Sequence, residues 1–270
     1  MENRSFLPET NRIGVLTAAV LLAFALTRLL PTSAIELHFT IGEFFLIYPI
    51  NLTTVLTLLA GGLTATGMDW LLRGHPALGK GSPVEHWLLP TLTTLVTGVP
   101  LALLPGGVSW WVTFAIAGLV LVVVFIAEYI VVDPAAPNYA AATVLLTALS
   151  FAVYLILLVA LHSSNPRLIL LLPSVFIVSG LVSLRALHLR LHGRWEFAWA
   201  GGIALVSAQL ASALHYWPLT PIRFGLALLG PLYALTSLAG SLGENTPVRR
   251  ALVEPVIVTA LAWAAAALLG

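Results

Sequence analysis

Nine long apolar runs separated by short turn-forming segments constrain this chain more than any other feature. The runs cover residues 13–30, 49–72, 85–104, 108–132, 138–161, 167–190, 196–215, 221–240 and 251–269. Each approaches the roughly 20 mostly apolar residues that a transmembrane helix needs. Only 9% of the chain is charged, against about 25% in a typical soluble domain. The sequence therefore predicts an all-α fold, a polytopic transmembrane helical bundle with about nine spans.

The segments between the runs are short and rich in proline, glycine and asparagine. Examples are Pro105-Gly106-Gly107, Asp133-Pro134 and Asn165-Pro166. Such connections make neighbouring helices antiparallel and leave no room for a soluble domain. We expect a single integral membrane domain over residues 1–270, with a short polar tail at residues 1–12. The first run lacks a plausible cleavage site, so we interpret it as a retained helix rather than a signal peptide.

The distribution of Lys and Arg predicts the orientation, because these residues are retained on the cytoplasmic side of a membrane. With the N-terminus in the cytoplasm and nine spans, the cytoplasmic set is Arg4, Arg12, Arg73, Lys80, Arg185, Arg190, Arg194, Arg249 and Arg250. The opposite side holds Arg28, Arg167 and Arg223. The N-terminus is therefore predicted to be cytoplasmic and the C-terminus extracytoplasmic. We expect an integral protein of the bacterial cytoplasmic membrane.

Residues 35–48 fit this scheme least well. The stretch is aromatic and apolar but carries Glu36, His38 and Glu43. It is short and charged for a span, so we interpret it as an extracytoplasmic interfacial or re-entrant segment. An additional span is the alternative.

Small residues and one proline predict how the helices pack. The motif GGLTATG at residues 61–67, and the glycines and alanines of residues 198–211, should let helices approach closely. The threonines near residues 53–66 and 91–97 should bond to carbonyls of their preceding turn, or line a polar path. Pro231 lies inside the eighth run and should kink it, because proline removes a backbone donor.

Ionisable residues in a bilayer are costly and therefore mark candidate functional sites. One candidate cluster lies near the predicted cytoplasmic ends of the helices: Asp69, Arg73, Glu85, His86, Glu128, Asp133, Arg185, His188 and His192. Carboxylates and histidines there could hold a divalent metal or orient a phosphate. His188 and His192 are four residues apart and share a helix face, although no carboxylate stands at a recognised spacing. The competing interpretation is a set of interface anchors that pair with one another.

A second candidate cluster is extracytoplasmic: His38, His162, Arg167, His215 and Arg223. Histidine and arginine in two successive extracytoplasmic loops could bind an anionic headgroup or a substrate carboxylate. The alternative is an ordinary belt of aromatic and polar residues at the membrane surface.

Several classes of protein are disfavoured by what the sequence lacks. The only lysine, Lys80, lies in a loop, which disfavours a retinal Schiff base. Cysteine is absent, so thiolate metal sites are excluded. The chain contains no P-loop, HExxH or GxSxG motif, and its net charge of +1 gives no reason to expect a nucleic-acid partner.

Three hypotheses follow. The first is binding or transport of a lipid or small apolar molecule, or service as an accessory subunit of a membrane complex. The second is an enzyme acting on a lipid headgroup or isoprenoid phosphate at the cytoplasmic face, with Asp69, Glu85, Glu128 and Asp133 as candidates. The third is a structural scaffold. Membrane lipids are the expected partners in each, with membrane proteins as further candidates. The sequence does not identify a cofactor.

Overall fold

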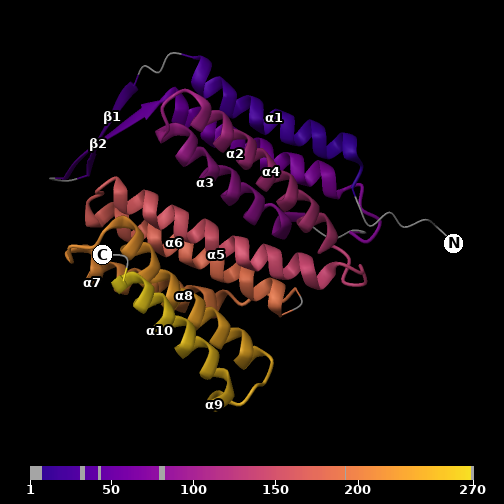
Figure 1. Cartoon of the computed structure of the whole chain (residues 1–270), viewed down its shortest axis with the longest axis vertical. Coiled ribbons are helices and arrows are strands. Elements are labelled where there is room, and N and C mark those ends of the chain that lie inside the picture. Colours follow the sequence, from indigo (N-terminus) through magenta and orange to yellow (C-terminus); the bar gives the residue numbers. More distant parts are fainter. Residues whose placement is uncertain (1–7, 31–33, 42–43, 79–82, 192, 269–270) are drawn as a thin grey trace. The chain divides into compact units, whose positions relative to one another are not determined.

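The computed structural model describes residues 8–30, 34–41, 44–78, 83–191 and 193–268. The chain is predominantly helical (Figure 1) and divides into two compact units, Met1–Ala142 and Thr143–Gly270. Within the described ranges, nine helical segments are long and apolar enough to cross a membrane. The predicted number of spans and the all-α fold class are confirmed, and the chain is a polytopic membrane protein.

The first unit contains four of these segments and a hairpin. The helices are α1 (Thr10–Leu29), α2 (Leu52–Leu72), α3 (Leu88–Leu103) and α4 (Val108–Ile130), and the short 3₁₀ helix η1 (Pro83–His86) leads into α3. The strands are β1 (Ala34–Ile41) and β2 (Phe44–Asn51). They pair antiparallel, with His38 opposite Ile47.

The hairpin occupies the stretch that we interpreted as interfacial or re-entrant. Both strands are rich in β-branched and aromatic residues, which favour extended backbone. Asn51 then ends the hairpin and starts α2, because its side-chain oxygen accepts a hydrogen bond from the Thr54 amide at 2.8 Å. Such a cap satisfies one of the free amides at a helix start. Where the hairpin lies relative to the bilayer stays a prediction.

The second unit contains the remaining helices. They are α5 (Tyr139–Ser163), which begins in the last residues of the first unit, α6 (Leu168–Arg190), α7 (Phe197–His215) and α8 (Pro221–Gly243). The last span is divided into α9 (Val248–Ala251) and α10 (Val253–Leu268). The predicted boundaries agree with these helices to within a few residues.

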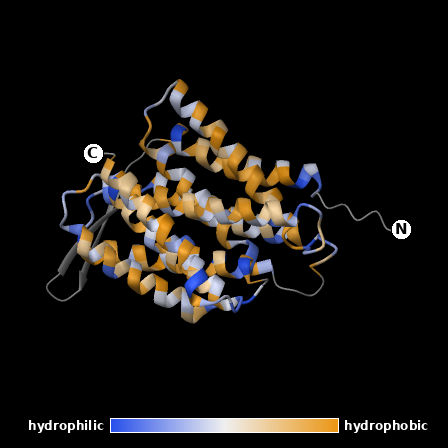
Figure 2. Ribbon diagram, turned by 60° about the horizontal axis from the view of Figure 1, so that its bottom comes forward, coloured by the Kyte–Doolittle hydropathy of each residue, from blue (hydrophilic) through white to orange (hydrophobic). Residues whose placement is uncertain are grey.

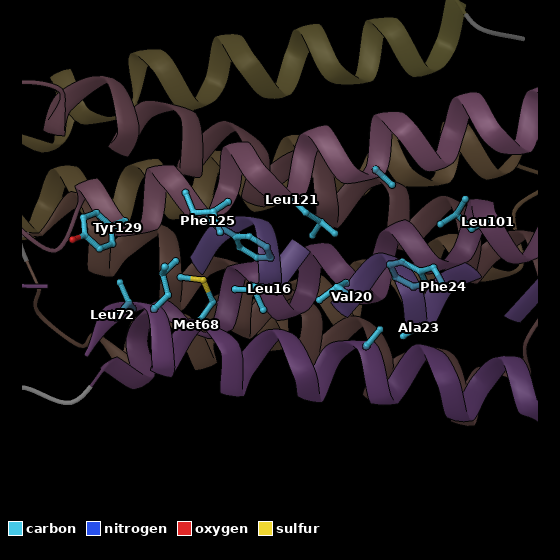
Figure 3. Packing of buried hydrophobic residues seen from close by; sticks show 14 of the residues in the cluster. Leu16, Val20, Ala23, Phe24, Met68, Leu72, Leu101, Leu121, Phe125 and Tyr129 are labelled. Atoms are coloured by element: carbon cyan, nitrogen blue, oxygen red, sulfur yellow. The ribbon is translucent and has the colours of Figure 1, made fainter. Parts of the chain in front are cut away.

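Each unit has an apolar core built from one face of each helix. In the first unit, Leu16, Val20 and Phe24 are spaced four residues apart and form the buried stripe of α1. Side chains of α2 and α4, including Met68 and Phe125, complete this core (Figure 3). In the second unit Phe224, Leu228 and Leu232 form the corresponding stripe of α8.

The outer surface is largely apolar as well. Leu58, Leu119 and Leu261 are more than half exposed, and hydrophobic residues run along the helices while hydrophilic ones gather at helix ends and in loops (Figure 2). Leucine in such positions would be unfavourable in water. In hydrocarbon it is the expected lipid-facing surface.

The predicted small-residue packing of α2 is present. A side chain at Gly67 would meet the Leu16 side chain at 2.1 Å, and one at Gly61 would meet Leu95 at 3.0 Å. These glycines therefore allow α2 to approach α1 and α3 closely. Several threonine hydroxyls, including those of Thr57 and Thr93, donate to the preceding turn as expected, whereas Thr91 Oγ1 is buried without a partner in the described part of the structure. Thr64 Oγ1 lies 2.8 Å from Thr94 Oγ1 across α2 and α3.

Pro231 lies inside α8, which continues without interruption from Pro221 to Gly243. A proline at this position leaves the carbonyl of Ala227 without its helical donor. The indole Nε1 of Trp263, on α10, donates a hydrogen bond to that carbonyl at 3.1 Å. The neighbouring Gly230 has no side chain to hold α10 away, since a Cβ there would lie 2.8 Å from the Ala262 Cβ.

Candidate functional site

Glu128 and His86 form a buried ionisable pair in the first unit. Glu128 lies near the end of α4 and is 0% exposed, and its Oε2 is 2.8 Å from Nδ1 of His86 in η1. The His86 Nε2 is 3.3 Å from Oε1 of Glu85, which is more accessible. Three residues of the predicted cytoplasmic cluster therefore lie together, with the His86 ring between the carboxyl groups of Glu85 and Glu128.

The other two acidic residues of the predicted cluster have separate local partners. Asp69 accepts a hydrogen bond from Arg73 Nε at 2.7 Å, one helical turn further along the chain. Asp133 accepts a hydrogen bond from the Ala135 amide at 2.9 Å and so stabilises the turn after α4. Within the described ranges, no group of three or more His, Asp or Glu is arranged to hold a metal. This arrangement gives no support to an enzyme that uses Asp69, Glu128 and Asp133 together.

His75 belongs to this end of the first unit, although it is not a member of the predicted cluster. It is buried in the loop after α2, its ring meets that of Tyr129 edge-on at 4.4 Å, and its Nδ1 accepts a hydrogen bond from the Ala77 amide at 3.1 Å. An accepting Nδ1 requires the neutral imidazole. Burial lowers the pKa of His75; the Asp133 charge opposes this effect and His86 adds to it. Only its position in a polar loop, between two predicted spans, could have drawn attention to it.

Arg185 and His188 lie on α6 in the second unit. Both are buried and neither is without a partner. The His188 ring packs against Trp195 at 4.3 Å between ring centres. His192, the second member of the predicted pair, lies outside the described residues. The metal site suggested by that pair is therefore untested.

The extracytoplasmic candidates have several different roles. His162 Nε2 lies 3.2 Å from the Leu219 carbonyl, and its ring stacks on Phe224 at 4.2 Å. His162 thus ties the end of α5 to the start of α8. His38 is on β1, and its side chain lies outside the described part of the structure. Arg167 directly precedes α6 and makes contacts within the chain.

His215 and Arg223 flank the connection between α7 and α8. His215 ends α7, and its ring meets Tyr216 edge-on at 4.9 Å. Arg223 is in the first turn of α8, and its backbone amide bonds to Thr220, which caps the helix. The predicted cluster is thus brought together only in part, at the start of α8.

A cavity of about 350 Å³ lies in the second unit between α5, α6 and α8. Its volume falls in the range of about 300 to 1,000 Å³ that is usual for small-molecule sites. Apolar side chains form most of its wall, including Val144, Ala148 and Phe151 of α5 and Ala186 of α6. Hydroxyl groups and one guanidinium complete it: Thr143, Thr147, Tyr233, Thr236, Ser237 and Arg190.

The guanidinium of Arg190 is held in place by several partners on or just after α8. Nε and Nη2 donate to the two Glu244 oxygens at 2.9 and 3.1 Å, a bidentate pair. Nη1 donates to the Ser237 carbonyl at 3.1 Å and Nη2 to Ser241 Oγ at 3.0 Å. Gly240 makes room for this arrangement, because a Cβ there would lie 2.6 Å from Arg190 Cδ. The positive charge in the cavity wall is therefore already compensated.

Tyr233 also lines this cavity, and its hydroxyl donates a hydrogen bond to Glu254 at the start of α10. Thr236 Oγ1 donates to Ser183 Oγ at 3.2 Å. Most polar groups of the cavity wall are thus hydrogen-bonded and the Arg190 charge is compensated, whereas Thr143 Oγ1 is buried without a partner in the described part of the structure. The cavity can accommodate a hydroxyl or carbonyl group more readily than an ion.

The family assignment rests on one comparison. The family described as "Protein of unknown function (DUF5656)" matches residues 31–269. The chain belongs to this family. The match covers the hairpin and α2 to α10, whereas α1 precedes it. No curated protein and no solved structure matches the chain.

Proposed function

We propose that this protein binds a lipid or another small apolar molecule inside the membrane, in the cavity between α5, α6 and α8. The cavity carries the proposal because it combines an apolar wall with a small hydrogen-bonding end. That combination is typical of small-molecule sites, where a few polar groups orient a largely apolar ligand.

The charges around the cavity support a ligand with a neutral head. Glu244 compensates Arg190 through two hydrogen bonds. An anionic ligand would therefore compete with a carboxylate that is already in place. A hydroxyl or carbonyl head can instead bond to the threonine and serine hydroxyls at the same end. A diacylglycerol, a free isoprenoid alcohol or a quinone has this chemistry.

The test is to purify the full chain in mild detergent and to identify co-purifying small molecules by mass spectrometry. Ala148 is exposed in the cavity wall, so A148F should fill part of the cavity without disturbing the core. A198F is the matched control, because Ala198 is equally exposed on α7 and does not line the cavity. We expect one class of neutral apolar molecule with the wild type and A198F, and its loss from A148F.

Two results would contradict this proposal. The first is wild-type protein that carries only the bulk lipids of the membrane in their ordinary proportions. The second is retention of the enriched molecule by folded A148F. Thermal unfolding of each variant in the same detergent distinguishes loss of the ligand from loss of the fold.

A second candidate function is that of an accessory subunit of a membrane complex. The observation in its favour is the outer surface of α7, where Ala198, Gly201 and Gly202 are exposed and open space lies beyond both glycines. Small residues on a lipid-facing surface allow a further helix to approach closely. Cross-linking in native membranes from a photoreactive residue at position 202 tests this function. A discrete protein adduct supports it, and labelling of lipid alone contradicts it.

A further inference from the structure

A second hollow in the same unit has different chemistry. It is a groove of about 410 Å³ between α7, α8 and α10. Its wall is almost entirely apolar, with Leu210, Leu214 and Leu219 on one side and Ala227, Trp263 and Ala266 on the other. Among the described residues of this lining, Arg223 alone is ionisable.

Arg223 differs from Arg190, whose charge Glu244 compensates. Within the described ranges, the Arg223 guanidinium forms no hydrogen bond or ion pair, and its Nε is buried without a partner. A guanidinium beside an apolar groove is electrostatically complementary to an anion that carries an apolar chain. Arginine matches the geometry of a phosphate particularly well, since it can donate two parallel hydrogen bonds.

Trp217 indicates that the Arg223 end of the groove lies at the depth of lipid headgroups. Trp217 lines the groove beside the start of α8 and is more than half exposed. Exposed tryptophan is enriched where hydrocarbon meets the polar headgroups. Arg223 lies in the first turn of α8, beside the α7–α8 connection that contains Trp217. A phosphate at headgroup depth could therefore reach it.

The contacts of His162 keep this wall in place. His162 is hydrogen-bonded to the Leu219 carbonyl and stacked on Phe224. These contacts fix the connection that supplies Trp217 and Leu219 to the groove. Two members of the predicted extracytoplasmic cluster, His162 and Arg223, thus contribute to this site, although His162 does not line it.

We infer that this groove binds an anionic phospholipid, with an acyl chain along α7, α8 and α10 and its phosphate on Arg223. The site is separate from the cavity between α5, α6 and α8. Arg223 and Tyr233 are ten residues apart on α8, or about 15 Å along the helix axis. The two sites also differ in their preferred headgroup, anionic here and neutral there, so either can be present without the other.

The experiment measures tryptophan quenching by brominated lipids in vesicles that contain the full chain. One set of vesicles carries phosphatidylglycerol with brominated chains in unlabelled phosphatidylcholine. The other set carries the same mole fraction of brominated phosphatidylcholine in unlabelled phosphatidylglycerol. We expect stronger quenching by brominated phosphatidylglycerol, corresponding to a preference of about fivefold for one arginine near the membrane surface.

R223Q should reduce this preference to about one, whereas R223K should retain part of it. R28Q is the matched control, because it removes an exposed arginine of the first unit that is predicted to lie on the same side of the membrane. A213L places a larger side chain in the groove at an exposed position of α7. It should reduce the specific quenching by phosphatidylglycerol without changing the net charge.

Three results would overturn the inference. Equal quenching by the two brominated lipids in the wild type excludes a selective site. If R223Q and R28Q lose the preference for phosphatidylglycerol to the same extent, the preference reflects general attraction to an anionic surface. Full retention of the preference in A213L shows that the groove does not hold the chain. If R223Q does not fold, the comparison of A213L with R28Q still decides the question.

Discussion

The indole nitrogen of Trp263 donates a hydrogen bond to the carbonyl of Ala227, the one acceptor that Pro231 leaves without a helical donor. The hydrocarbon of a bilayer contains no water that could donate a hydrogen bond to such a carbonyl, so a side chain of a neighbouring helix donates it instead. The proline thus creates an acceptor in α8 that a donor from α10 can use. This relationship connects the last span to the core of the second unit.

W263F should therefore destabilise the protein by about 1 kcal/mol, the usual net contribution of one hydrogen bond. The cost should shrink in a P231A background, because alanine restores a backbone N–H that can reach Ala227. The measurement is a double-mutant cycle of unfolding free energies in detergent. W217F is the control, since Trp217 lines the same groove and has no such bond to α8 within the described residues. An identical W263F cost with and without Pro231 would falsify this account.

The stability of the first unit should depend on pH through His75. Burial lowers the pKa of His75 below its ordinary value of 6.5. As the pH falls below about 6.5, the unfolded chain therefore takes up the proton before the folded one does, and the free energy of unfolding decreases. The stabilising contribution is complete above that pH and is lost as the pH falls through the folded-state pKa.

Thermal unfolding between pH 5 and 8 measures this dependence. H75F keeps an aromatic ring against Tyr129 but cannot bind a proton, so its unfolding temperature should change less between pH 7 and 5 than that of the wild type. The variant also loses the hydrogen bond from the Ala77 amide, which lowers its stability equally at all pH values. Parallel pH profiles for H75F and the wild type would assign the effect to other groups.

The helices could be predicted from the sequence because the bilayer imposes a length on each apolar run. The hairpin at Ala34–Asn51 was not predicted, although a signal for it is present. Gly42-Glu43 separates two runs rich in β-branched and aromatic residues, a pattern typical of a tight β-turn. Glu36, His38 and Glu43, in contrast, favour an interfacial segment. The length that the bilayer requires of a transmembrane helix gives no information about the structure of a shorter segment such as this hairpin.

The candidate site was less predictable than the fold, because sequence gives the depth of a residue but not its partners. Asp69 and Arg73 could be paired from their spacing of one helical turn. The pairing of His86 with Glu128 joins residues 42 positions apart, and it depends on how η1 packs against the end of α4. The cavity and the groove each depend on the sizes of side chains from three helices. The sequence pattern of a single apolar run therefore does not predict either of them.

Gly240 should be intolerant of substitution. In G240A the new Cβ would lie 2.6 Å from Arg190 Cδ and 2.8 Å from its Nε, so the arginine must move away from Glu244, Ser237 and Ser241. We expect a loss of about 1 to 3 kcal/mol, since hydrogen bonds between charged groups are strong and partly buried here. G202A is the control, because Gly202 is also helical and open space surrounds it. Helix propensity predicts that G202A is neutral or stabilising by up to about 1 kcal/mol. Similar unfolding temperatures for the two variants would show that Arg190 adapts freely.

The bond between Thr64 and Thr94 should measure how much a polar contact contributes to helix packing in the first unit. The hydroxyls are 2.8 Å apart and fully buried between α2 and α3. T64V, T94V and the double variant form a cycle whose coupling should be about 0.6 kcal/mol and at most about 1.7 kcal/mol, as for other interhelical bonds in membranes. T93V is the control: Thr93 is also buried on α3, but its hydroxyl donates to Leu89 of its own helix. Coupling between T64V and T93V as large as that between T64V and T94V would show that the effect comes from general repacking.

The orientation predicted from Lys and Arg can be tested by reporter fusions that are active on only one side of the membrane. Fusions after Gly74 and after Arg194 should report the cytoplasm, and fusions after Gly107 and at the C-terminus should report the opposite side. These positions follow α2, α6, α3 and α10, so each additional span reverses the expected side. The hairpin provides a further check, because a crossing there would invert every fusion after it relative to the N-terminus. A tag at the N-terminus and the fusion after Gly74 should report the same side. Opposite sides for these two would mean that the predicted orientation is wrong from α2 onward.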